Sequence, residues 1–193
     1  MIRTVTEDDA AAITDIYNYY VSETTVSFET TPLSVSEMLQ RIRTIAVSFP
    51  YFVAEEEGRV VGYSYAHLWK EREAYCHTWE VTIYLAHDCK GRGIGSRLMR
   101  QLVDACCARE DCGQLIACIT AENAASIAFH SRMGFEKVSH FKRVGFKFDR
   151  WLDVVDMELR INPPQPSQRE GERIKNEESE NSENSECSDN YEL

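Results

Sequence analysis

Lys90-Gly91-Arg92-Gly93-Ile94-Gly95 follows an apolar segment, residues 81–85, and precedes an amphipathic one. The first segment predicts a strand and the second predicts a helix. Glycines at a strand-to-helix turn let backbone N–H groups approach an anion, and the helix N-terminus behind them adds about half an elementary positive charge. This arrangement is typical of a site for a pyrophosphate group.

The spacing of the glycines indicates which pyrophosphate is bound. A dinucleotide site would have G-x-G-x-x-G and an acidic residue about 20 positions later, on the next strand. Here the glycines are spaced G-x-G-x-G, and the next predicted strand, residues 114–120, is uncharged. The nearby acids, Glu110 and Asp111, lie at the end of the predicted helix. We therefore favour the pyrophosphate of coenzyme A.

A second motif lies downstream, where residues 123–135 have the pattern N-x-x-S-x-x-F-x-x-x-x-G-F. The glycine loop and this helix motif, about 28 residues apart and in this order, resemble the two signatures of the GNAT N-acetyltransferases and are more specific than a lone glycine loop. The resemblance covers roughly residues 1–160. It implies an α/β fold with a mixed, mostly antiparallel sheet and helices on both faces.

One branch of that family matches more closely. The sequence W-K-E-R-E-A-Y at 69–75, followed by T-W-E at 78–80, is similar to the phosphinothricin acetyltransferases. The resemblance implies acetyl transfer from acetyl-CoA to the α-amine of a small amino-acid analogue such as phosphinothricin, methionine sulfoximine or methionine sulfone. Two departures concern the acceptor: Phe148 stands where the plant-resistance enzymes have His, and Trp79 is bulkier than the residue usual there.

The order of the predicted elements agrees with such a fold. Strand and helix periodicities and capping signals predict a mixed α/β sheet covered by helices on both faces. The predicted strands are 2–5, 51–56, 59–67, 77–85, 114–120, 136–148 and 151–160, and the predicted helices begin near 6 and 34 and cover 93–110 and 122–133.

Glu80 and His130 are the candidate catalytic residues. Glu80 lies mid-strand between two large apolar residues, a pattern that equally allows an exposed strand carboxylate. The resemblance implies that Glu80 is the general base, and partial burial would raise its pKa toward neutrality. His130 occupies a position where many family members have a Tyr that protonates the leaving thiolate. The alternative for His130 is an ordinary histidine on a helix surface.

The remaining candidate residues bind acetyl-CoA or the acceptor. We expect acetyl-CoA, as co-substrate, to contact Ile83, Leu85, Lys90, Gly91, Arg92, Gly93, Ile94, Gly95, Ser96, Asn123 and Ser126. An amino-acid-like acceptor has a carboxylate, for which Arg is the best planar partner. The resemblance therefore favours Arg72 and Tyr75 for the acceptor, with Phe28 and Lys147 as secondary candidates.

Composition limits the partners and the domain organisation. The net charge of −11 argues against nucleic acid or an anionic membrane as a partner. Residues 162–193 have nine acids and three bases among Glu, Asn and Ser repeats, so we expect a disordered acidic tail after a catalytic domain at 1–161. The tail is either a solubilising appendage or a segment that binds a partner or is phosphorylated.

Cysteine usage indicates the compartment. The seven cysteines form no C-x-x-C pair, and no secretory segment begins the sequence, so we expect reduced thiols and a cytoplasmic location. Cys106 and Cys107 are adjacent and diverge on a helix, so we expect no metal site. Members of the branch are often homodimers, and the resemblance allows one here.

Three functional classes stay open at this point. The first is the amino-acid N-acetyltransferase, and the second is an N-acetyltransferase for a peptide N-terminus, a polyamine or an aminoglycoside. The third is a non-catalytic acyl-CoA-binding module. Glu80 and His130 argue against the third, because a binding module needs neither.

Overall fold

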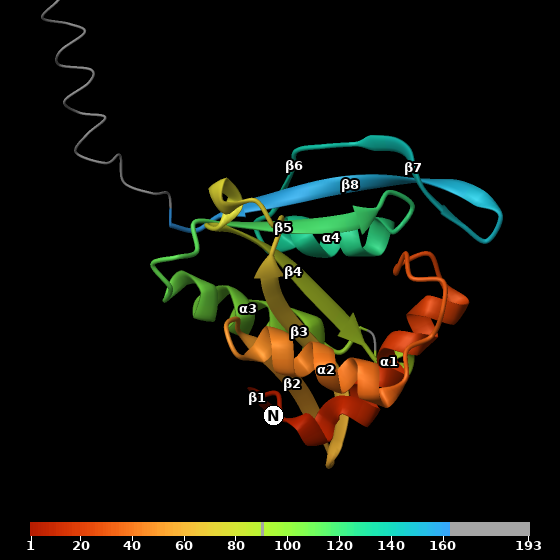
Figure 1. Ribbon diagram of the computed structural model, residues 1–193, viewed down its shortest axis with the longest axis vertical. Helices are drawn as coiled ribbons and strands as arrows, with labels where there is room; N and C mark the ends of the chain where they lie inside the picture. Colours follow the sequence, from red (N-terminus) through yellow and green to blue (C-terminus); the bar gives the residue numbers. More distant parts are fainter. Residues whose placement is uncertain (90, 163–193) are drawn as a thin grey trace, which may run out of the picture. The chain divides into compact units, whose positions relative to one another are not determined.

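A mixed eight-stranded sheet forms the centre of the computed structural model, which describes residues 1–89 and 91–162 (Figure 1). Lys90 and the predicted tail beyond Asn162 lie outside the described residues. The strands are β1 (Ile2–Thr4), β2 (Tyr51–Glu56), β3 (Arg59–Leu68), β4 (Thr78–Leu85), β5 (Gln114–Thr120), β6 (Glu136–Lys137), β7 (Phe141–Lys147) and β8 (Arg150–Arg160). The helices are α1 (Ala10–Glu23), α2 (Val35–Ala46), α3 (Ile94–Cys107) and α4 (Ala124–Arg132), with 3₁₀ turns at Glu7–Asp9, Glu73–Tyr75 and His87–Cys89.

The strand pairings confirm the mostly antiparallel sheet. The order is β1-β2-β3-β4-β5-β8-β6, with β7 also paired to β8, and β4–β5 is the parallel pair among these strands. That pair is short: its register covers Thr78–Glu80 against residues 114–116. Beyond Glu80 the two strands no longer pair.

Helices cover both faces of the sheet, as predicted. Successive strand residues point to opposite faces, so Gly62 and Tyr63 identify the two sides. A Cβ on Gly62 would lie 3.3 Å from Leu98 of α3, whereas Tyr63 packs with Tyr84, which contacts Tyr17 of α1. The helices α1 and α2 therefore lie on one face and α3 lies on the other, as Figure 1 shows.

Local sequence signals explain several element boundaries. The Ser34 hydroxyl accepts a hydrogen bond from the Glu37 N–H, and the Glu37 carboxylate accepts one from the Ser34 N–H, which makes the predicted capping box of α2. The β2–β3 turn places Glu57 at φ 51° and Gly58 at φ 76°. Positive φ at both central residues is typical of a two-residue hairpin turn.

Two predicted elements differ from the structure. The helix predicted over 93–110 ends at Cys107, because Arg109 turns away to bond Asp111 and the Ser48 carbonyl. The single strand predicted over 136–148 is two strands, β6 and β7. A register shift in β7 puts Arg143 at φ 52°, and the Arg143 N–H bonds the Asp153 carboxylate instead of a strand partner.

Candidate active site

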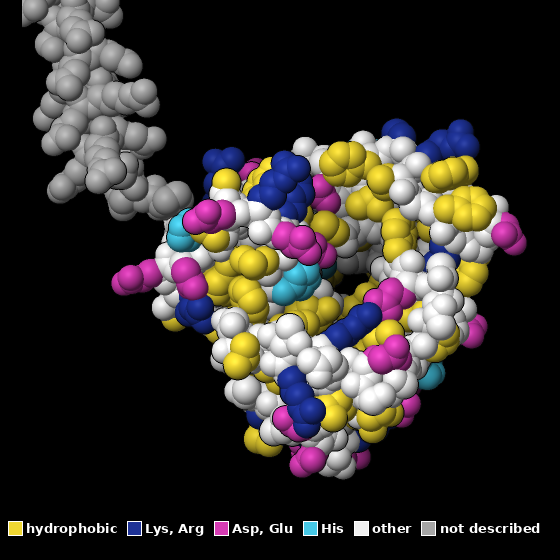
Figure 2. Space-filling view, viewed as in Figure 1, with side chains coloured by type: hydrophobic (Ala, Val, Ile, Leu, Met, Phe, Trp, Pro, Cys, Tyr) yellow, Lys and Arg dark blue, Asp and Glu magenta, His cyan; other side chains and the backbone are white. Residues whose placement is uncertain are grey.

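A cavity of about 580 Å³ opens where β4 and β5 diverge. Its walls come from β3, β4, β5, the start of α4 and the segment after α1, and the space-filling view shows this hollowed face (Figure 2). Its volume lies within the range of small-molecule sites, roughly 300–1,000 Å³. The strand residues that line it are Tyr65, His67, Glu80, Val81, Thr82, Ile83, Tyr84, Ala117, Cys118, Ile119, Thr120 and Val154.

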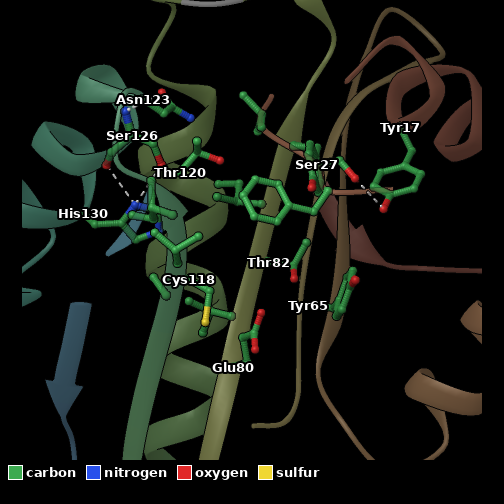
Figure 3. A pocket seen from close by; sticks show the side chains of 18 of the residues that line it. Tyr17, Ser27, Tyr65, Glu80, Thr82, Cys118, Thr120, Asn123, Ser126 and His130 are labelled. Atoms are coloured by element: carbon green, nitrogen blue, oxygen red, sulfur yellow. Dashed lines mark hydrogen bonds between the residues drawn. The ribbon is translucent and has the colours of Figure 1, made fainter. Parts of the chain in front are cut away.

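Glu80 points into this cavity from β4, close to Cys118 of β5 (Figure 3). Burial raises the pKa of its carboxyl, and the nearby Asp156 carboxylate acts in the same direction. The His67 side chain, its register partner on β3, and a hydrogen bond from Cys118 lower the pKa but do not cancel the effect of burial. A carboxylate with a raised pKa is better matched to accepting a proton near neutral pH.

His130 lies on the α4 side of the cavity, below Ser126 in Figure 3, and is buried. Its Nδ1 is 2.9 Å from the Ser126 carbonyl oxygen. A carbonyl can only accept, so Nδ1 has the proton in the neutral ring and Nε2 has the lone pair. Burial lowers the pKa of the ring, and the bond to Ser126 opposes this. His130 is therefore suited to accept a hydrogen bond rather than to donate a proton.

The first turn of α4 places two more predicted residues on the cavity wall. The Asn123 side-chain oxygen accepts from the Ser126 N–H at 3.1 Å and caps the helix. Its amide nitrogen has no hydrogen-bond partner among the residues that the structure describes and lies at the cavity, as Figure 3 shows. Asn123, Ser126 and His130 are thus brought together, as the i, i+3, i+7 spacing predicts.

The glycine loop lies at the N-terminus of α3. Gly91 and Gly93 have φ of 78° and 75°, a conformation that favours glycine, and open space lies where their side chains would be. The loop also meets the cavity wall: a Cβ on Gly95 would lie 3.5 Å from Leu85, 3.6 Å from Phe129 and 3.8 Å from Ile83. Open backbone at a helix N-terminus fits a pyrophosphate group.

The other loop residues have mixed surroundings. Arg92 is exposed and forms a 2.8 Å ion pair with Glu56, and Arg97 lies 3.4 Å from the same carboxylate. Ile94 is buried under the loop and Ser96 is half-buried. The prediction for Lys90 falls outside the described residues.

The acceptor candidates divide into two groups. Phe28 lines the cavity, and Lys147 is buried just behind it, where its ammonium donates to the Ser27 carbonyl at 2.7 Å. Arg72 and Tyr75 lie in the β3–β4 loop, outside the cavity wall. Tyr75 packs there against Trp69 with a ring-centroid distance of 5.4 Å.

The two departures noted in the sequence have different surroundings. Trp79 is buried in the core below the cavity and packs edge-on against Phe49. Phe148 is exposed in the β7–β8 turn, at φ 50°. The bulk of Trp79 is therefore accommodated by the core, and Phe148 does not line the cavity wall.

Sequence reasoning missed one charged pair in the cavity. Arg41 of α2 contacts Glu29 at 2.6 Å, and both residues line the wall. Arg41 follows Met38 by three positions, so it flanks the buried stripe of α2, and this spacing was a usable signal. Among the described residues that line the cavity, Arg41 is the one Lys or Arg.

The segment from Thr24 to Glu29 closes one side of the cavity, and several bonds attach it to distant strands. Thr120 donates to the Thr25 carbonyl at 2.6 Å, and Thr25 donates to Glu122 at 2.6 Å. The Tyr17 and Ser27 hydroxyls are 2.9 Å apart (Figure 3). These bonds fix the wall that includes Phe28.

Two further findings apply to residues 1–89 and 91–162. No helix in this part of the chain has the length and apolar character to cross a membrane. Nor does it contain three or more His, Cys, Asp or Glu side chains grouped to hold a metal ion.

Comparison with known proteins gives consistent matches. Residues 2–155 match the family model for the acetyltransferase (GNAT) domain. Over 163 residues the chain is 40% identical to phosphinothricin N-acetyltransferase of Alcaligenes faecalis, covering 83% of this chain and 82% of that protein. Over 164 residues it is 34% identical to L-methionine sulfoximine/L-methionine sulfone acetyltransferase of Salmonella typhimurium, covering 83% and 94%.

A solved structure extends the similarity to the fold. A GNAT superfamily phosphinothricin acetyltransferase from Sinorhizobium meliloti, in complex with AcCoA, superposes with a TM-score of 0.81 at 37% identity. The match covers 86% of this chain and 94% of that one.

Proposed function

Since this chain belongs to the acetyltransferase (GNAT) domain family and is an acetyl-CoA-dependent acyltransferase, we propose that its acceptor is the α-amine of a small amino-acid analogue. The names of its relatives support this acceptor class, with phosphinothricin, methionine sulfoximine and methionine sulfone as examples. The cavity of about 580 Å³ also suits a small molecule.

The position of Glu80 is the observation that supports this proposal best. An α-amine is mostly an ammonium at neutral pH and must lose a proton before its nitrogen can attack the thioester carbonyl. Glu80 faces the cavity with a raised pKa, so its carboxylate can take that proton directly or through a water molecule. The proton then passes to solvent.

Acetyl-CoA supplies the activated acetyl group as a thioester. We propose that residues 91–96 hold its pyrophosphate and that Ile83, Leu85, Asn123 and Ser126 contact the arm that reaches the cavity. Because β4 has no strand partner on the β5 side beyond Glu80, backbone groups on this edge are available to bond the arm. His130, neutral and with its lone pair on Nε2, would accept a hydrogen bond there.

Acceptor recognition combines the carboxylate and the side chain of the substrate. Arg41, which is paired with Glu29, is the cation on the cavity wall, and the half-exposed ring of Phe28 lines the same cavity. Arg72 and Tyr75 stay proposals from the resemblance, since they lie outside this wall. A peptide N-terminus or a polyamine is the competing acceptor class, and it needs no cation in the cavity.

The test is acetyl-CoA-dependent thiol release with separate acceptors. Methionine sulfone, methionine sulfoximine, phosphinothricin, spermidine and a short peptide are each offered to the wild type, to Glu80→Gln and to a control, Glu136→Gln, whose carboxylate is exposed on β6. We expect turnover of the carboxylate-bearing amines, a loss of roughly 10²–10⁴ in kcat for Glu80→Gln and no loss for the control. Coenzyme A affinity should be the same in all three.

The outcomes separate the acceptor classes. Turnover confined to spermidine or the peptide would refute the amino-acid acceptor while keeping the enzyme. Full activity of Glu80→Gln would refute Glu80 as the base. Acetyl-CoA binding without turnover of any acceptor would refute the proposed acceptor class.

A further inference from the structure

Four titratable side chains form a row across four neighbouring strands beside the cavity. His67 of β3 and Glu80 of β4 are register partners, and Cys118 of β5 and Asp156 of β8 are register partners. The order β3-β4-β5-β8 makes these strands consecutive in the sheet. Glu80 therefore lies between a histidine on one side and a thiol with a second carboxylate on the other.

Cys118 lies between the carboxylates of Glu80 and Asp156. Cys118 is the register partner of Asp156 on β8 and lines the cavity together with Glu80, so its thiol lies close to both carboxylates (Figure 3). Burial and the two negative charges raise the pKa of the thiol, so it stays protonated and acts as a donor. A thiol has one proton, so it can donate to only one of the two carboxylates at a time.

Asp156 of β8 is the second carboxylate of this row. It is a carboxylate with 9% exposure, and buried acids are rare unless they are paired. Its charge favours the protonated form of Glu80, whereas the Cys118 hydrogen bond favours the ionised form. On the β3 side, His67 and Tyr65 also face this group, and His67 favours the ionised form of Glu80.

We propose that Asp156 is a positioning residue for the acetyl transfer, acting through the Cys118 thiol to set the pH range in which Glu80 can take the acceptor's proton. This inference rests on the proposed role of Glu80 as the base. When Glu80 is ionised, the thiol donates to it. When the proton moves from the acceptor's nitrogen to a Glu80 oxygen, the thiol turns to Asp156, so both states of Glu80 keep a hydrogen-bonded neighbour.

Substitutions of Asp156 and Cys118 should therefore move the acidic limb of the pH profile of kcat/KM in opposite directions. Asp156→Asn removes the negative charge, so the limb moves to lower pH. Cys118→Ala removes the donor, so the limb moves to higher pH. Cys118→Ser keeps an O–H donor and should stay near the wild-type profile. Glu158→Gln, a carboxylate two residues along β8 that bonds Gln114, is the matched control and should leave the limb unchanged.

A second measurement needs no turnover. In uniformly ¹³C-labelled protein, the Glu80 carboxyl resonance is assigned by its loss in Glu80→Gln, and its titration is followed in the same variants. Opposite shifts for Asp156→Asn and Cys118→Ala support the proposal, while shifts of one sign or no shift overturn it. If Asp156→Asn does not fold, the contrast between Cys118→Ala and Cys118→Ser decides instead. Opposite titration shifts without turnover of any acceptor would refute the acceptor class and leave the coupling to Glu80 intact.

Discussion

Gly145→Ala tests how closely Phe28 is held against the cavity wall. Phe28 lies over Gly145 of β7, and a Cβ built on Gly145 would lie 2.0, 2.6 and 2.7 Å from three of its ring atoms. Carbon atoms pack at about 3.5–4.0 Å, so the ring would have to move by roughly 1.5 Å. The substitution therefore displaces Phe28 without altering Phe28 itself.

The expected cost follows from burial and backbone conformation. Overpacking typically costs about 1–3 kcal/mol, and Phe28 is 41% exposed, so the ring can swing outward and the cost should fall at about 1–2 kcal/mol. Gly145 does not have a positive φ, so alanine adds no backbone strain. In a protein that lacks the Phe28 ring, Gly145→Ala should stabilise the folded state by about 0.4–1 kcal/mol, because alanine reduces the conformational freedom of the unfolded chain.

A double-mutant cycle with Phe28→Ala measures this directly. Urea unfolding of the four proteins should show Gly145→Ala destabilising in the wild-type background and neutral or stabilising in the Phe28→Ala background. The melting temperature of the single variant should fall by roughly 2–8 °C. An equal cost of Gly145→Ala in both backgrounds would refute the steric argument, because the clash has no partner once the ring is gone.

Three further predictions concern stability. Ser64 is fully buried and its hydroxyl has no hydrogen-bond partner among the described residues, so Ser64→Ala should raise the free energy of unfolding by about 1 kcal/mol in urea titration; a loss would reveal a hidden partner. The Arg150 guanidinium lowers the pKa of Glu122 to about 2, so this pair should stabilise the fold above pH ~4.3 and lose that contribution as the pH falls toward 2. Both side chains are half-exposed, so water screens the pair and its contribution to stability should be small, and Glu122→Gln should flatten the melting-temperature profile in that range. Burial lowers the pKa of His130 below its ordinary 6.5, so stability should fall as the pH drops below about 6.5, and a His130→Gln variant that kept this slope would contradict the assignment.

The local elements follow from short-range signals. The Ser34–Glu37 capping box and the Glu57-Gly58 hairpin turn lie where the sequence predicts them. The single strand that periodicity predicts over 136–148 is wrong at residues 138–140, which separate β6 from β7. There the backbone N–H groups of Val138 and Ser139 donate to the Asp156 carbonyl. Those bonds depend on how β8 packs beside this segment, so the local alternation of residues does not predict them.

The sequence by itself was enough to predict the proposed acetyl-CoA site of this protein, because a glycine loop at a helix N-terminus and the 123–130 helix face are local arrangements of backbone and side chains. Only the tertiary structure decided what surrounds Glu80. Cys118 and Asp156 act on it because β5 and β8 follow β4 in the sheet, and Arg41 reaches the cavity because α2 packs on the sheet face that Tyr63 identifies. The pKa of a buried carboxylate depends on the groups within a few ångströms of it. The fold brings those groups together from positions dozens of residues apart.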